Sequence, residues 1–181
     1  MRPSPRRIPA RKRMAHPKID VDVLDRQSEA RIDHSRIVQA VTFVLERHER
    51  AIPVSILLTD DVTIRDMNRR FLNHDWATDV ITFPRDEDDF AAPEGLSDEA
   101  GTGGGDLVVS VETARRESAE RGADVEAEVL LYVVHGVLHL LGFDDRDDES
   151  SRRMNLETGE ILWALGIDAS SLGADFGRVG S

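Results

Sequence analysis

His135, His139 and Asp145 are the residues whose types and spacing best suit chemistry. The histidines lie four residues apart in the segment 135–149 (HGVLHLLGFDDRDDE), so on a helix both imidazoles share one face, about one turn apart. Gly142 allows the chain to leave that helix and turn back. Asp145 then offers a carboxylate six residues after His139. Two imidazoles, one carboxylate and an open fourth position are typical of a catalytic zinc site, where the metal makes a bound water acidic.

The surroundings of the two histidines favour metal binding over burial alone. The pair lies in the most apolar segment of the chain, where two unliganded imidazoles would lose water without gaining a partner. An acid cluster at 144–149 follows, which is more typical of a solvated loop, so we expect Asp145 alone of these acids to be a ligand. For Asp144 two roles stay open: it orients a ligand histidine from outside the coordination sphere, or it caps the turn.

The same spacing is similar to the metzincin protease pattern H-E-x-x-H-x-x-G-x-x-H. Such a protease uses the glutamate after the first histidine as its general base. This chain has Gly136 at that position. Peptide hydrolysis is therefore disfavoured.

The segment 135–145 (HGVLHLLGFDD) resembles the YbeY family pattern H-G-x-L-H-L-x-G-Y/F-D-H. Further segments resemble the family in the same order along residues 19–165, namely 54–68 (VSILLTDDVTIRDMN), 78–83 (TDVITF), 105–110 (GDLVVS) and the final helix at 154–165. The resemblance implies a metal-dependent endoribonuclease specific for single strands. It also implies maturation of the 3′ end of 16S ribosomal RNA, ribosome quality control, and ribosomal RNA and the ribosome or its subunits as partners.

Two positions depart from the family pattern. Asp145 stands where the family has its third histidine ligand; Zn²⁺, one ion per chain, remains the expected metal, but two histidines and a carboxylate also suit iron or manganese. Leu72 stands where the family has an arginine associated with nuclease function. Arg65, Arg69 and Arg70 are candidates to hold RNA phosphates nearby, although a solvated helix face also explains them.

Two alternatives to the nuclease stay open. One is a ribosome-associated factor with a structural metal and little nuclease activity, which the departure at Leu72 favours. The other is a metal-dependent hydrolase of another substrate. We expect no small-molecule organic cofactor in either case.

The elements that must position these residues follow from the apolar periodicity of the chain. Strands are predicted at 19–24, 54–59, 79–83 and 106–111, and helices at 34–48, 60–72, 111–121, 125–141 and 149–165. This order predicts an α+β fold: a small mixed four-stranded sheet, covered on one side by helices packed around the buried central helix 125–141. The strands joined by the acidic loop are expected to be antiparallel. Phe71, Phe83 and Phe143 are predicted to lie in the core.

The chain is expected to hold one domain at 19–166, with an acidic mobile loop at 85–105 and a flexible tail at 167–181. The segment 1–18 carries seven bases and no acid, which predicts a disordered arm. That arm is an RNA-touching segment, an inert extension, or the product of a start codon placed too early.

The composition sets further limits. The chain has 181 residues and no cysteine, which excludes disulfides, cysteine-ligated zinc, iron–sulfur clusters and a thiol nucleophile. No apolar run approaches the roughly 20 residues of a membrane helix, so no membrane partner is expected and the cytoplasm is the expected compartment. The net charge of −12 disfavours a basic nucleic-acid coat. However, 12 of the 35 acids fall in the segments 86–99 and 144–149, so whole-chain charge is a poor guide to the partner.

Overall fold

The computed structural model describes residues 19–85 and 103–172. The predicted arm at 1–18 lies outside the described residues, as do most of the predicted acidic loop (86–102) and the tail from residue 173.

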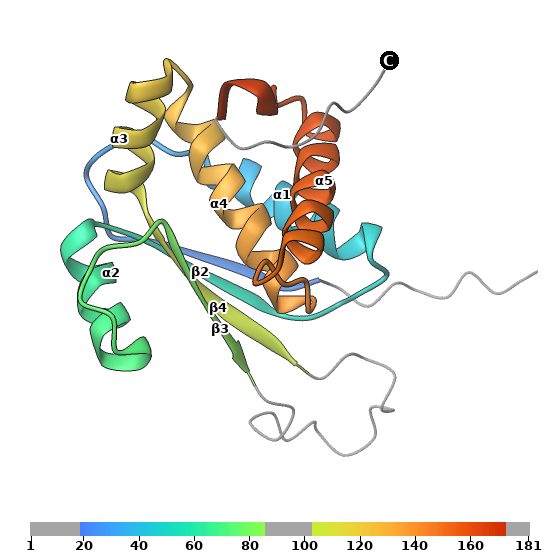
Figure 1. Cartoon of the computed structure of the whole chain (residues 1–181), viewed down its shortest axis with the longest axis horizontal. Coiled ribbons are helices and arrows are strands. Elements are labelled where there is room, and N and C mark those ends of the chain that lie inside the picture. Colours follow the sequence, from blue (N-terminus) through green and yellow to red (C-terminus); the bar gives the residue numbers. More distant parts are fainter. Residues whose placement is uncertain (1–18, 86–102, 173–181) are drawn as a thin grey trace, which may run out of the picture.

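The sheet has four strands in the order β1-β2-β4-β3 (Figure 1). The strands are β1 (Val21–Asp25), β2 (Val54–Thr59), β3 (Val80–Arg85) and β4 (Gly104–Ser110). β1 pairs with β2 and β2 with β4 in parallel, whereas β3 is antiparallel to β4. The predicted mixed sheet and its antiparallel pair are therefore confirmed.

Four helices cover one face of this sheet, and three of them pack around the fourth, α4 (Figure 1). They are α1 (His34–Arg47), α3 (Val111–Arg121), α4 (Val125–Leu140) and α5 (Asp148–Ala164). Ten of the sixteen residues of α4 are buried, because this helix packs against α1, α3 and α5 as well as against β3 and β4. A helix that is apolar on every side is expected to lie inside a fold, and α4 does.

A helix also covers the opposite face of the sheet, so the prediction that helices cover only one side was wrong. The helix α2 (Asp61–Met67) packs there, with Ile64 in a small cluster with Ile81 and Val108. The predicted cap is present, since Asp60 accepts a hydrogen bond from the backbone N–H of Thr63 at 2.8 Å.

The predicted helix 60–72 changes its winding after α2. Its last turn is the π-helical turn η1 (Asn68–Leu72), which Asn73 ends with a left-handed backbone at φ 60°. Phe71 lies on this turn with 66% of its surface exposed. The prediction of Phe71 in the core was therefore wrong, because the wider π turn rotates its side chain away from the helix face that Ile64 buries.

The predicted flexible tail begins too early. Ile167 and Leu172 are buried, and the short 3₁₀ helix η3 (Ala169–Leu172) follows α5. These two isolated apolar residues gave no periodic signal, yet both belong to the main core.

β3 ends two residues later than the predicted strand 79–83, because it continues through Pro84 to Arg85. A proline is tolerated there because β3 is at the edge of the sheet. Among the described residues, no helix is both long and apolar enough to cross a membrane.

Candidate functional site

The end of α4 presents His135 and His139 toward the loop that follows it. Both histidines are only partly buried, with about a quarter of each side chain exposed. Gly142 then takes a left-handed backbone at φ 86°, which glycine adopts without strain. This turn brings Asp145 back over the two imidazoles.

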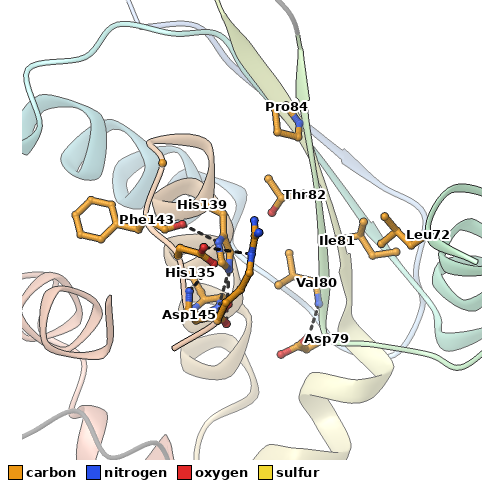
Figure 2. Close-up of a pocket in the computed structure, with 13 residues that line it drawn as sticks. Leu72, Asp79, Val80, Ile81, Thr82, Pro84, His135, His139, Phe143 and Asp145 are labelled. Atoms are coloured by element: carbon orange, nitrogen blue, oxygen red, sulfur yellow. Dashed lines mark hydrogen bonds and ion pairs between the residues drawn. The ribbon is translucent and has the colours of Figure 1, made fainter. Parts of the chain in front are cut away.

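Three potential ligand atoms converge at this point (Figure 2). The Nε2 atoms of His135 and His139 lie 3.2 Å apart. The carboxylate Oδ2 of Asp145 lies 3.7 Å from Nε2 of His135 and 3.9 Å from Nε2 of His139. Among the described residues, these three form the group that could hold a metal ion.

The hydrogen bonding of His139 suits a metal ligand. Its Nδ1 lies 3.0 Å from the carbonyl oxygen of Phe143, which can only accept, so Nδ1 carries the proton and Nε2 presents its lone pair. Phe143 is itself held in place: its ring makes an edge contact with His48, and the guanidinium of Arg153 lies 5.4 Å from its centroid. The loop that fixes His139 is thus anchored to α1 and α5.

The electrostatics favour a neutral His135. Burial lowers the pKa of its imidazole, and the neighbouring His139 lowers it further, while Asp145 and Asp79 act in the opposite direction. A neutral imidazole is the form that binds metal ions.

These residues fit a metal ion by their chemistry and spacing. Ligands about 2.0–2.2 Å from a tetrahedral zinc lie about 3.3 Å from one another. The histidine pair matches that separation, and Asp145 needs a shift of only a few tenths of an ångström. Three protein ligands leave a fourth position for water or substrate.

The three residues border a cavity of about 600 Å³ (Figure 2). One wall is the loop 142–146, and the opposite wall is the residues 79–84 that lead into and form β3. Leu72, at the position where the family pattern has an arginine, also lines the cavity. The space therefore gives a long substrate access to the cluster between α4 and the edge strand.

The contacts of Asp144 suit the turn-capping role, the second of the two roles predicted for it. Its carboxylate accepts a hydrogen bond from the backbone N–H of Asp145 at 2.9 Å and pairs with Arg146 at 3.1 Å. These contacts lie within the turn, and the Nδ1 of His139 is hydrogen-bonded to the carbonyl of Phe143 rather than to Asp144.

The three arginines predicted to hold RNA do not line the cavity. Arg65 pairs with Asp75 at 3.0 Å, and Arg69 pairs with Asp66 at 2.8 Å. Arg70 is exposed on η1.

Two residues that sequence reasoning passed over do line the cavity. Arg146 follows Asp145 in the loop 142–146, and its place between acidic residues made it look like part of a charge run. Asp79 lies across the cavity, with its Oδ1 fixed by the backbone N–H of Val80 at 2.8 Å and the hydroxyl of Thr78 at 2.9 Å. The sequence signal that could have pointed to Asp79 is its position at the start of the predicted strand 79–83.

Comparisons with known proteins agree with this geometry. Residues 22–166 match the family described as Endoribonuclease YbeY. An Endoribonuclease YbeY of Carboxydothermus hydrogenoformans is 39% identical over 134 residues, which cover 73% of this chain and 85% of that protein. One of Heliobacterium modesticaldum is 41% identical over 123 residues, covering 63% and 70% respectively.

The fold has a solved counterpart. The solution structure of TM1509 from Thermotoga maritima covers 88% of this chain and 99% of its own, with a TM-score of 0.50 and 23% identity. The likeness supports the fold alone. Together with the match over residues 22–166, the sequence relatives show that this chain belongs to the YbeY endoribonuclease family.

Proposed function

We propose that this protein is a metal-dependent endoribonuclease that cleaves single-stranded RNA. One observation carries the proposal: His135, His139 and Asp145 direct three ligand atoms to one point on the wall of an open cavity. Its relatives bear the name of an endoribonuclease, which supplies the substrate class.

The residues divide the work by their chemistry. His135, His139 and Asp145 hold the metal, which when bound makes a water acidic and offsets charge on the phosphate. The carbonyl of Phe143 fixes the ring of His139. Arg146, on the same loop, brings a guanidinium to the cavity, where it can pair with a phosphate oxygen. Asp79 faces the site with one oxygen already hydrogen-bonded and can accept a proton on the other.

The physiological setting follows from the family resemblance. We propose ribosomal RNA as the substrate, maturation of the 3′ end of 16S rRNA and ribosome quality control as the roles, and the ribosome or its subunits as partners in the cytoplasm. Zn²⁺ is the proposed metal, and the carboxylate of Asp145 keeps iron and manganese as candidates.

The rival of a purely structural metal is less well supported. Structural zinc sites are closed by four protein ligands. In the part of the chain that the structure describes, three ligands meet beside a cavity of about 600 Å³. An open coordination position of this kind suits a reaction rather than a structural role.

The test is cleavage of a single-stranded ribosomal RNA fragment, with and without chelator, by the wild type and by His135→Ala and His139→Ala variants. The proposal predicts cleavage by the wild type alone, and only without chelator. Intact RNA with a wild-type protein that carries its metal would overturn it and favour the structural role.

A further inference from the structure

The loop between η1 and β3, whose flanking residues Leu72 and Asp79 line the cavity, exposes an aromatic pair. Trp76 has 57% of its surface exposed, an unusual state for the side chain with the most apolar surface. The imidazole of His74 stacks on its indole, with ring centroids 4.5 Å apart and planes inclined by only 14°. We call these two side chains the His74–Trp76 stack.

The backbone of this loop is held in place. The buried side-chain amide of Asn68 donates a hydrogen bond to the carbonyl of Trp76 at 2.9 Å, and the backbone N–H of His74 donates to the carbonyl of Asn68 at 3.3 Å. Asn68 is only 2% exposed. The loop therefore presents the stack from a fixed position, which lowers the entropy lost when a ligand binds.

Cationic side chains gather around the same loop. Asp75, between the two stacked residues, pairs with Arg65 at 3.0 Å and lies 3.9 Å from Arg69. Arg70 is exposed on the adjoining turn η1. Asp66, which pairs with Arg69 at 2.8 Å, and Asp75 offset two of these three guanidinium charges, whereas Arg70 forms no ion pair among the described residues. One net positive charge therefore remains beside the exposed tryptophan, which suits a ligand that carries both phosphate and an aromatic ring.

The loop lies at the edge of the candidate active site. Leu72 and Asp79, the residues that bracket it, both line the cavity. Trp76 is three residues from Asp79, so their Cα atoms are at most about 11 Å apart. A base on the stack would belong to a nucleotide close to the one at the cluster of His135, His139 and Asp145.

We propose that the His74–Trp76 stack is a platform on which a nucleobase of single-stranded RNA stacks while the adjoining backbone enters the cavity. This inference rests on the proposed function and names the feature of the substrate that the site recognises. A duplex keeps its bases stacked on one another and offers no free face. The platform therefore selects unpaired RNA with little regard to sequence, because every base has such a face.

The test measures binding separately from cleavage. His135→Ala serves as background for every variant, so that RNA stays intact and affinity does not depend on the nuclease reaction. The ligands are a short single-stranded RNA and the same strand with abasic sites. Trp76→Ala is compared with Trp76→Phe, which keeps a stacking ring, and with Trp163→Ala, which removes a still more exposed tryptophan from the end of α5.

The platform predicts a loss of affinity of roughly 5- to 150-fold for Trp76→Ala, as expected for one stacked base. Trp76→Phe should keep most of the affinity, Trp163→Ala all of it, and the abasic strand should bind the Trp76→Ala and unaltered proteins equally. Because the chain has two tryptophans, Trp163→Phe leaves Trp76 as the sole indole, and RNA should quench its fluorescence.

Unchanged affinity in Trp76→Ala, or an equal loss of affinity for the abasic strand, would overturn the platform. Neither result touches the cleavage test, so the two proposals fail independently.

Discussion

Gly136 of α4 lies directly against Leu107 of β4. A Cβ atom built on Gly136 would lie 2.4 Å from Cδ2 of Leu107 and 3.2 Å from the hydroxyl oxygen of Thr82. The position that a metzincin fills with its catalytic glutamate is therefore closed by the sheet. A glycine at this position lets α4 approach the sheet closely, and a glutamate side chain has no room there.

Replacing Gly136 by alanine should destabilise the fold. Alanine favours a helix over glycine by about 1 kcal/mol, but overpacking a core costs about 1–3 kcal/mol, and here the added methyl group meets Leu107. We expect a net loss in the free energy of unfolding, measured by denaturant titration.

A double-mutant cycle provides the control for this prediction. In a Leu107→Ala background the clash is relieved, so Gly136→Ala should become neutral or stabilising. An equal penalty in both backgrounds would contradict the close contact.

Asp145 and Asp144 form a matched pair for the metal site. Asp145→Asn removes the charge of a proposed ligand and should weaken metal binding by about 100-fold or more. Substitution of residues outside the coordination sphere already lowers metal affinity by about 10–100-fold. Asp144→Asn keeps an oxygen for the N–H of Asp145 and should cost less than about 10-fold. Competition with a chromogenic chelator measures both, and equal losses would remove Asp145 from the ligand set.

The ion pair between Arg47 and Glu157 predicts a pH-dependent stability. The hydrogen bond from Arg47 is the main cause that lowers the pKa of Glu157 below its ordinary 4.5, with the charges of Arg47 and His48 adding to it. A depressed carboxyl pKa contributes stability above the unfolded value, and that stability is lost as the pH falls through the folded value. Arg47→Met should therefore lose about 1 kcal/mol at pH 7 and progressively less below pH 4.5.

Urea unfolding at several pH values checks this dependence. The control is Arg152→Met, which removes an exposed arginine of α5 that forms no ion pair among the described residues. A penalty for Arg47→Met that stays constant down to pH 3 would contradict the assignment to Glu157.

Leu172 should contribute to stability despite its place near the end of the chain. It is 1% exposed, and replacing a buried leucine by alanine costs about 2–5 kcal/mol. Leu156→Ala, at a leucine 47% exposed on α5, should change the free energy of unfolding by less than about 1 kcal/mol. Equal thermal shifts in the two variants would show that the segment after α5 does not pack.

The strongest periodic segments allowed the sheet and its main helices to be predicted. The apolar run of α4 and the histidine spacing led directly to the cluster, because both signals are local in the chain. The position of Arg146 and Asp79 could not be predicted, since it depends on how β3 packs against α4 across 50 residues. The prediction that Phe71 lies in the core was wrong for another reason: it assumed that the α-helix continues, whereas the chain forms the π-helical turn η1 there.

The tail shows a further limit. Ile167 and Leu172 are buried singly, and a single apolar residue in a polar segment carries no period. Tertiary packing alone decides such positions.

The central claim is that RNA cleavage depends on a metal held by His135, His139 and Asp145. Its most direct test strips the protein with chelator, returns Zn²⁺, Mn²⁺ or Fe²⁺ in steps, and measures metal content and cleavage of single-stranded RNA on the same sample. Cleavage should vanish in the stripped protein, rise in proportion to bound metal and level off at one ion per chain. Full cleavage by protein without bound metal would contradict the account.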